Sequence, residues 1–513
     1  MRVGLLSEGG YPYAAGEGGE WCDRLVRGLA QHDFELYALS RTARQEDSGW
    51  HALPGNVRRV RAAALWGVPT GGTGRGYGPG GRDRRRRFAA HFGDLAAAIT
   101  LPGDQAYRFT DGLNGLADLA RDEGGLATAL RSEDALRVLE NACRAPGAHP
   151  AAYDIRVPDL LLVTGHLERA LRPLSLDWYG TADGDRGLAA VDLCHATSAG
   201  PAALPGLMAK RFFGTPLLVT EYEVGLRAHH LASLDSADDL SRPVRTLLAA
   251  FHRQLAALVY AEAALITAGD GQGRRWQERC GADRARLRTV HPGTDAGLYE
   301  TAGETEEAEP TGDPLLVWTG GPTEPHLWEA LAALRADHPG LRLRVVGAPP
   351  DTTDGADRVE YTPARGPEDY PAGSIVLLSG AQDGFPTALT EAMFCGRPTV
   401  SPDVGAVREV IGGTGLVVPA RRAGPLTEAC RALLEDPARR ARLGAAARAR
   451  ALELFTVEQN VAAFGALYLE VLSRAPVTHT ACDPAVPFSR AAGDSTPLAV
   501  SPRSASPTWA GRP

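Results

Sequence analysis

The chain has 513 residues, of which 44% are hydrophobic and 23% are charged, and its formal net charge is −8 at pH 7. This length suffices for two or three domains with full-sized cores. The negative charge argues against a general nucleic-acid-binding surface. No stretch approaches the roughly 20 apolar residues of a membrane span, and the apolar run at the amino terminus is too short for a signal peptide. Seven dispersed cysteines without a CxxC pair favour reduced thiols over a zinc site. We therefore expect a cytoplasmic protein without a metal, while docking to a membrane complex stays open.

The chain begins with a strand, a glycine-rich loop, a helix and a second strand. Residues 2–6 and 34–39 are the expected strands, residues 7–19 the loop and residues 21–30 the helix. This order is typical of a nucleotide-binding half-sheet, in which glycines let the backbone approach a ligand closely. The spacing is not GxGxxG, which counts against a plain dinucleotide-binding module.

A change of composition follows. Residues 66–81 are rich in glycine, and Arg82 begins a basic run that ends at Arg87. We expect a flexible excursion here. Its arginines could contact an anionic acceptor, lipid head groups or phosphate, but a solvated loop is the more frequent case. Residues 88–150 have a helical pattern and few chemical groups, so we expect an insert at about 61–150.

The next strand-like runs end in polar residues. A short strand is expected at residues 160–164, and others at residues 216–222 and 263–267. His195 stands within an apolar run that starts at Val191. A histidine at the carboxyl end of a strand can hydrogen-bond a sugar hydroxyl or the reacting centre, although a lone histidine is more often structural. The acidic residues 301–313, with Pro310 and Gly312, are the expected interdomain linker.

A second strand–helix–strand unit contains Asp383 and Glu391. The apolar residues 374–378 predict a buried strand, residues 387–394 a short helix and residues 398–401 a second strand. Polar residues at the carboxyl end of the first strand lie where parallel sheets bind ligands, and a helix amino terminus there suits a phosphate. Glu391 could accept hydrogen bonds from a ribose diol. Acidic residues near a helix start are, however, common as partners of the helix dipole.

The remaining carboxy-terminal segments complete an α/β pattern. We expect strands at residues 315–318 and 341–347, helices at residues 426–434 and 437–454, and a final helix from about 455 to 473. From residue 475 onward the chain is rich in Pro, Ser, Thr and Ala, which predicts a disordered tail.

The segment from Asp383 to Glu409 resembles the donor-site signature of glycosyltransferase family 4, which are retaining sugar transferases with the two-domain GT-B fold. In that signature two acidic residues have seven others between them. Gly-Phe-Pro follows the first and Glu-Ala-Met begins at the second, as here after Asp383 and at Glu391. A later Gly has a Glu four residues on, here Gly405 and Glu409. One departure is Asp383, where the family usually has Glu.

The amino-terminal half resembles PelF-type glycosyltransferases, family 4 members that build an exopolysaccharide. The resemblance rests on three segments, which are Glu8–Tyr13 with Gly18, Gly19 and Trp21; Asp192 to Gly200, with His195 at a fixed position; and Thr220-Glu221. The family continues with His-Gly after Thr-Glu, whereas this chain has Tyr222 and Glu223. Residues 292–295, Pro-Gly-Thr-Asp, resemble the turn that ends the first domain in many members.

A more serious departure lies after the expected strand 315–318. The family has an Arg and, five residues later, a Lys that hold the donor pyrophosphate. Here Gly321 and His326 stand at those positions. The leaving diphosphate develops negative charge in the transition state, so this loss should remove electrostatic stabilisation unless another cation substitutes.

The resemblance implies an α/β GT-B protein of two Rossmann-like domains facing across a cleft, with a helical insert and a disordered carboxy-terminal tail. The expected parts are an acceptor-side domain at 1–300, a linker at 301–313, a nucleotide-sugar-binding domain at 314–454, a crossover helix at 455–474 and the tail at 475–513.

The implied activity is a retaining, hexosyltransferase-type transfer from a nucleoside diphosphate sugar, with a UDP-sugar expected, to a saccharide or other hydroxyl acceptor, and it needs no cofactor. Exopolysaccharide or glycoconjugate synthesis, and association with a membrane polysaccharide-assembly complex, stay open. The implied site residues are His195 and Asp383 at the reacting centre; Gly18, Gly19, Gly384, Phe385, Pro386, Thr387, Ala388, Leu389 and Glu391 for the donor; and His326 and Arg408 as candidate phosphate contacts.

Two rival interpretations follow from the same residues. A catalytically degenerate GT-B protein, serving as a nucleotide-sugar-binding or scaffolding subunit, would explain Gly321, His326, Tyr222 and Glu223. A GT-B epimerase acting on a nucleotide sugar is the third interpretation. The donor base, the sugar, the acceptor and the oligomeric state are not predictable from the sequence.

Overall fold

The computed structural model describes residues 1–14, 18–67, 81–180, 186–227, 240–300, 313–319, 325–346, 358–362, 366, 368–378 and 385–474. Several predictions lie outside these residues. They concern the linker up to residue 312, Gly321, Asp383, Gly384 and the tail at 475–513. Among the helices that the structure describes, none is both long and apolar enough to cross a membrane.

The first sheet has seven parallel strands in the order β3-β2-β1-β4-β5-β6-β7. Their bounds are β1 Arg2–Glu8, β2 Asp33–Ser40, β3 Val57–Ala64, β4 Leu193–Ala196, β5 Leu217–Glu221, β6 Leu265–Ala268 and β7 Leu287–Thr289. The central strands are buried on both faces, as expected for a parallel sheet covered by helices. The strand order reverses direction between β1 and β4, which makes a topological switch point.

Helices cover both faces of the first sheet. Alternate side chains such as Val3 and Leu5 face the cluster formed with α1 (Gly19–Gly28) and α19 (Val457–Arg474). Side chains of the opposite register, such as Leu6, face the larger cluster formed with α9 (Leu204–Phe213), α11 (Arg242–Glu262) and the helices that follow β3. This alternation is the period-2 pattern of a strand. The smaller elements α2 (Ala43–Asp47) and α12 (Gly271–Arg279) lie in loops between strands.

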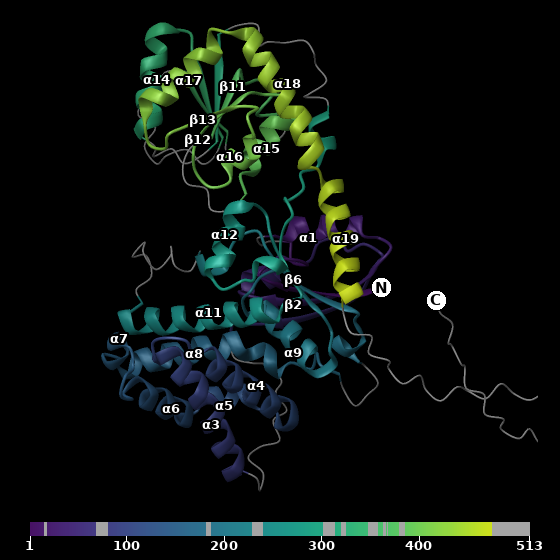
Figure 1. The fold of residues 1–513 in the computed structure, drawn as a ribbon, viewed down its shortest axis with the longest axis vertical. Coiled ribbons are helices and arrows are strands. Elements are labelled where there is room, and N and C mark those ends of the chain that lie inside the picture. Colours follow the sequence, from purple (N-terminus) through teal and green to yellow (C-terminus); the bar gives the residue numbers. More distant parts are fainter. Residues whose placement is uncertain are drawn as a thin grey trace, which may run out of the picture. The chain divides into compact units, whose positions relative to one another are not determined.

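The helical insert lies between β3 and β4, and α11 packs along it (Figure 1). Its helices are α3 Gly81–Thr100, α4 Ala106–Glu123, α5 Leu126–Leu130, α6 Glu133–Cys143, α7 Pro150–Tyr153 and α8 Val157–Leu171. The predicted strand at residues 160–164 is wrong, because this apolar run lies within α8, where Leu160 and Val163 are buried and residues 161–162 are exposed. A short apolar run does not distinguish a buried strand from a helix by periodicity alone.

The basic run is also helical rather than a loop. Arg82 to Arg87 form the first turns of α3. Arg84 and Arg87 pair with Glu123 of α4, and Arg85 pairs with Asp134 of α6. These acidic residues lie far along the chain, so the sequence pattern did not reveal them. The run therefore stabilises the insert through its ion pairs.

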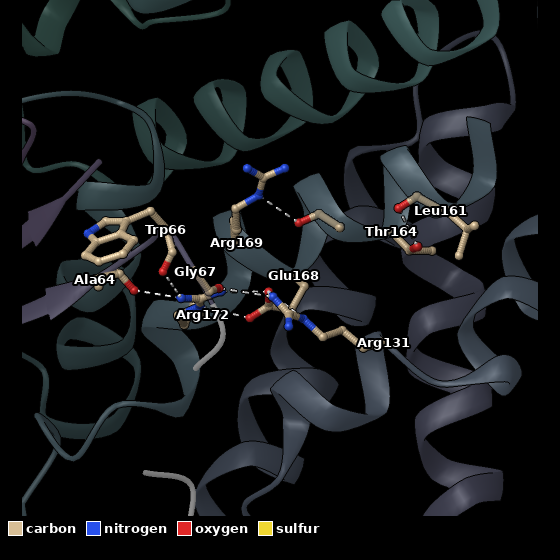
Figure 2. A network of polar contacts seen from close by, with 10 residues as sticks. Ala64, Trp66, Gly67, Arg131, Leu161, Thr164, Glu168, Arg169 and Arg172 are labelled. Carbon is tan, nitrogen blue, oxygen red and sulfur yellow. Dashed lines mark hydrogen bonds and ion pairs between the residues drawn. The ribbon is translucent and has the colours of Figure 1, made fainter. Parts of the chain in front are cut away.

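A buried ion network anchors the insert to the end of β3. Figure 2 shows Glu168 between Arg131 and Arg172. Glu168 is fully buried, and Arg172 also donates to the carbonyl oxygens of Ala64 and Trp66 at 2.8 and 3.2 Å. Every guanidinium nitrogen of Arg172 thus has an acceptor. Buried charges are tolerated when they are paired and hydrogen-bonded in this way.

The second sheet has six parallel strands in the order β10-β9-β8-β11-β12-β13. Their bounds are β8 Leu315–Thr319, β9 Arg342–Val346, β10 Val359–Thr362, β11 Ile375–Leu378, β12 Thr399–Pro402 and β13 Leu416–Val418. Leu316 and Trp318 face α14 (Pro325–Asp337) and α17 (Ala423–Leu434). Leu315 and Val317 face the layer of α15 (Thr387–Phe394), α16 (Val407–Ile411) and α18 (Pro437–Leu454). Two such doubly wound sheets in one chain confirm the predicted GT-B class.

The last helix returns to the first sheet. α19 follows α18 in the chain, yet Phe464, Tyr468 and Val471 are buried in the cluster with β1 and α1. Trp21 Nε1 of α1 donates to Asn460 Oδ1 of α19 at 3.2 Å. Gly293 of the predicted Pro-Gly turn lies directly against residues 456–457, where a β-carbon would come within 2.6 Å of the Val457 Cα. This close approach explains why the turn carries glycine.

Candidate functional site

Both groups of predicted site residues follow strands at switch points. Gly18 and Gly19 follow β1, and His195 lies in β4, which pairs with β1. Residues 385–391 follow β11, which pairs with β8. Ligands of doubly wound sheets bind beyond the carboxyl ends of the strands at these points. The topology therefore agrees with a ligand site at the carboxyl edge of each sheet. Which ligand could bind at each edge depends on the side chains there.

The glycine-rich loop after β1 leads directly into α1. Gly18 has a φ of 70°, a left-handed conformation that favours glycine, and Gly19 is the first helical residue. The carbonyl oxygen of Gly18 accepts from the Cys22 amide at 3.2 Å. The amino terminus of α1 is therefore aimed at the loop, as an anion-binding helix requires. The predicted contact of Gly18 and Gly19 with a diphosphate stays a prediction.

His195 occupies an unexpected place. Its ring is fully buried, Nδ1 is 2.8 Å from the Tyr468 hydroxyl, and Nε2 is 2.7 Å from Thr220 Oγ1. Thr220 Oγ1 is in turn 2.7 Å from Thr267 Oγ1. Burial lowers the pKa of His195 to about 3, so the ring is neutral at pH 7. The structure thus gives His195 an observed role, which is to join α19 to β4, β5 and β6.

This placement matches the structural alternative for His195. Both ring nitrogens already have protein partners, and the ring also packs edge-on against Trp21 and Tyr468. A contact with the reacting centre stays a prediction, because it would require one of these hydrogen bonds to be exchanged for a substrate. Tyr222, at the position where the resembled family has His, belongs to the same layer. Its hydroxyl accepts from Asn460 Nδ2 at 2.9 Å.

Helix α15 has a buried carboxylate at its centre. Glu391 is 9% exposed, and its Oε2 accepts a hydrogen bond from the Tyr370 hydroxyl at 2.7 Å. Tyr370 is itself fully buried. An ionised carboxylate offers about four acceptor positions, so a held glutamate can also receive ribose hydroxyls. Tyr370 was missed by sequence reasoning, because it lies 21 residues before Glu391 and belongs to no recognised pattern.

The residues before Glu391 form the entry of α15. Phe385 is half-buried and Pro386 is the residue that precedes the first helical turn. The amides of Thr387 and Leu389 donate to the carbonyl oxygens of Phe385 and Pro386 at 2.8 and 3.0 Å. The turn is therefore tight, and the predicted use of the Thr387, Ala388 and Leu389 amides for phosphate stays a prediction. Asp383 and Gly384 lie outside the described residues.

The two candidate phosphate contacts are in different surroundings. Arg408 is exposed on α16 and forms an ion pair with Asp403, which holds the pKa of that carboxyl below its usual range. His326 lies in the first turn of α14 and lines a cavity together with Arg421 and Arg422. Neither arginine was singled out from the sequence. The only signal there was two consecutive arginines directly before a helical pattern.

A second cavity opens at the carboxyl edge of the first sheet. Its lining includes Tyr222, Glu223 and Arg227 after β5, and Asp270 and Trp276 after β6. The guanidinium carbon of Arg227 is 5.8 Å from the centre of the Trp276 ring. An aromatic ring with charged groups beside it suits a polyhydroxylated ligand, which needs both an apolar face and hydrogen-bonding partners.

Glu221 connects the segments that line this second cavity. It is buried at the end of β5, and its Oε1 accepts from the Ala199 amide at 3.1 Å. Its other oxygen accepts from the Tyr260 hydroxyl of α11 and, at 3.5 Å, from Gln277 of α12. Burial raises the pKa of this carboxyl. Glu221 thus links the ends of β4 and β5 to the helix that carries Trp276.

Comparison with known families gives two matches in this chain. Residues 1–285 match the model described as "Domain of unknown function (DUF3492)", and residues 316–436 match "Glycosyl transferases group 1". The second match covers the second sheet and Glu391. The first match covers the first sheet, the helical insert and the cavity beside Trp276.

Curated relatives match only a part of the chain. The D-inositol 3-phosphate glycosyltransferase of Nocardia farcinica is 30% identical over 224 residues, which are 38% of this chain and 50% of that protein. The chain thus spans about half the length of the curated relatives it matches.

Solved structures match nearly the whole chain at low identity. Sucrose-phosphate synthase from Thermosynechococcus elongatus is 17% identical with a TM-score of 0.52, covering 92% of this chain and 99% of that one. The Anabaena protein HepE, crystallised with UDP, is 14% identical with a TM-score of 0.51, covering 91% and 100%. At these identities the similarity concerns the fold alone.

Proposed function

Since the chain belongs to the DUF3492 family, whose description names no activity, we propose from its site that it is a retaining glycosyltransferase. It would transfer a sugar from a nucleoside diphosphate sugar, with UDP as the expected carrier, to a saccharide or other hydroxyl acceptor. The donor would bind at the edge of the second sheet and the acceptor at the edge of the first.

The observation that carries this proposal is the Glu391 carboxylate on α15. It follows the switch-point strand β11, it is buried, and Tyr370 fixes its orientation. A carboxylate held in this way is pre-organised to accept from the two ribose hydroxyls. The match of residues 316–436 to glycosyl transferases group 1, and the names of the curated relatives, support the same donor class.

The acceptor would bind at the mouth of the cavity beside Trp276, since the cavity itself is too small to enclose a sugar ring. The guanidinium carbons of Arg227 and Arg279 lie 5.8 and 5.3 Å from the centre of the Trp276 ring, and with Asp270 they would provide charged hydrogen-bonding groups there. Most of the lining comes from the loops after β5 and β6, which Glu221 joins. The pocket is therefore supported by the first sheet, as a precise positioning site requires.

The proposed chemistry needs no protein base. The bond between the anomeric carbon and the diphosphate breaks, and the acceptor oxygen bonds to that carbon on the same face. The proton of the acceptor hydroxyl passes to the leaving phosphate oxygen. The protein would bind, orient and exclude water, and positive charge near the diphosphate would stabilise the leaving group.

The first test is a thermal-shift titration with UDP, GDP, ADP and their common sugar conjugates. A ligand that binds only the native state raises the melting temperature by mass action. We expect a shift with one nucleotide that is lost in Glu391→Gln and kept in Glu453→Gln, a matched change at an exposed glutamate of α18. No shift with any nucleotide, from folded protein, would overturn the proposal.

Turnover then separates the proposal from its two rivals. Incubation of the binding nucleotide sugar with saccharide acceptors should give a glycoside whose anomeric configuration, read by NMR, equals that of the donor. Binding without any product would favour the non-catalytic subunit, which the absence of the Arg–Lys pair at Gly321 and His326 supports. Release of an epimerised free sugar without an acceptor would favour the epimerase.

A further inference from the structure

A cavity at the edge of the second sheet brings three basic side chains together. It lies at the carboxyl ends of β11, β12 and β13, and side chains of α14 and α17 complete its apolar floor. His326, Arg421 and Arg422 line it. It is too small to enclose a ligand, so a group bound there would lie at its rim, where the basic side chains are.

The two arginines stand at positions where other residue types are preferred. Arg421 has a φ of 57°, the left-handed region that glycine normally occupies. Arg422 is the residue preceding the first turn of α17, and its side chain makes no capping hydrogen bond there. Ser, Thr, Asp and Asn are preferred at this position, and positive charge is disfavoured beside the positive end of a helix. Violations of this kind are expected where function requires them.

Arg421 and Arg422 are exposed, and within the described part of the chain their side chains form no hydrogen bond or ion pair. The basic run of α3 differs, because Arg84, Arg85 and Arg87 each pair with an acidic residue. Two adjacent cations at the rim of a cavity, with no acidic partner among the residues that the structure describes, favour an anionic ligand.

We propose that Arg421 and Arg422, together with His326, bind the diphosphate of the nucleotide-sugar donor. This inference rests on the proposed function. His326 aligns with the lysine that holds the pyrophosphate in the resembled family, and Gly321 with the arginine. The structure places two guanidinium cations at the same cavity as His326. They would replace the missing pair, and they stabilise the negative charge that develops on the leaving diphosphate.

The test compares UDP, uridine and inorganic pyrophosphate in calorimetric titrations of the full chain. The variant is Arg421→Gln/Arg422→Gln, and the control is Arg44→Gln/Arg442→Gln, which removes two exposed arginines elsewhere. We expect the variant to bind UDP at least about tenfold more weakly and with a shallower salt dependence, while uridine affinity stays the same. The control should bind UDP as the wild type does.

Two further single variants guard against a folding artefact. Arg421→Gly and Arg422→Asp each restore a locally preferred residue, so we expect an equal or higher melting temperature without ligand together with weaker UDP binding. A lower melting temperature in both would overturn the view that these arginines are retained for a ligand.

The outcomes keep this inference apart from the proposed function. If Glu391→Gln abolishes UDP binding and the Arg421/Arg422 variant binds like the wild type, the inference fails and the function stands. If pyrophosphate binding is lost in that variant and UDP binding is not, the cavity takes a separate phosphate compound and the donor assignment is wrong. If no nucleotide binds the wild type, both fail.

Discussion

The two switch points of this molecule have the same topology and different chemistry. At the first sheet, His195 ends β4 with both ring nitrogens paired inside the protein. At the second sheet, Glu391 follows β11 and accepts a hydrogen bond from Tyr370. The equivalent place in the fold thus carries a structural polar group in one sheet and a candidate ligand group in the other.

The difference shows that the position of a residue in the sheet topology does not determine whether its side chain is structural or binds a ligand. His195 is closed off because the crossover helix α19 covers that face of the first sheet with Phe464 and Tyr468. The sequence around β4 does not indicate that α19 covers this strand, since Tyr468 lies 273 residues from His195 in the chain. The cavity beside Trp276 is consequently the better candidate for ligand contact at the first sheet.

A substitution far from the carboxyl edges of both sheets serves as a reference for a change that affects stability and not ligand binding. Glu168→Gln should lower the free energy of unfolding by about 3–5 kcal/mol, because it leaves the buried Arg172 without a counter-charge. Urea denaturation measures the change. Glu133→Gln, which disrupts only an exposed pair on α6, should cost about 0.5 kcal/mol. Nucleotide affinity of the folded fraction should be unchanged in both.

The substitution His195→Ala tests whether the histidine is structural, as we infer, or catalytic. We expect a loss of about 2–4 kcal/mol in stability, because the change leaves a cavity and removes the partner of the buried Tyr468 and Thr220 hydroxyls. Differential scanning calorimetry together with UDP titration of the folded fraction checks it. A variant as stable as the wild type that cannot transfer sugar would return His195 to the reacting centre.

The pH dependence of stability sharpens the same point. The pKa of His195 is about 3 in the folded protein and about 6.5 when unfolded, so the unfolded state binds the proton between these values. Its contribution to stability is complete above pH 6.5 and is lost as pH falls toward 3, at about 1.4 kcal/mol per pH unit. At pH 5 the wild type should lose about 2 kcal/mol relative to its value at pH 7.

The control for this pH effect is His195→Gln measured over the same range. Its stability should fall less between pH 7 and pH 5, because glutamine does not titrate. If stability falls equally with pH in the two proteins, another group causes the loss of stability. His195 would then not be buried and neutral as described.

The smallest expected effect tests the other edge. Tyr370→Phe removes the hydroxyl that donates to Glu391 and keeps the ring that fills the core. The loss of one hydrogen bond to a carboxylate that orients the ribose should weaken UDP binding about three- to tenfold. Calorimetric titration measures it. An unchanged affinity would mean that Tyr370 does not orient Glu391 for a ligand.

Much of the fold was predictable because the apolar periods are regular. The bounds of α18 and α15, and strands such as β5 and β11, agree with the predicted segments within about a residue. The GT-B class followed from the resemblance of the segment around Glu391 to a known family signature. The short run 160–164 misled, because a short apolar run occurs in strands and in helices alike.

The candidate site was less predictable because its contacts are long-range. Glu391 stands in a local pattern and could be found, but its partner Tyr370 has no signature of its own. A ligand contact by the arginines of α3 was left open by the sequence, and the structure pairs three of them with acidic residues of α4 and α6. Arg421 and Arg422 were visible in the sequence only as two consecutive arginines before a helix, since a backbone torsion and a shared cavity are properties of the folded chain.

The most direct test of the central claim is hydrogen–deuterium exchange measured by mass spectrometry with and without saturating UDP. We expect UDP to slow exchange in peptides that cover Phe385 to Glu391, because the donor would bind against α15. Peptides that cover β4 around His195 should exchange equally with and without UDP, since that strand is already sealed. Protection at β4 without protection at α15 would contradict the assignment of the donor to the second sheet.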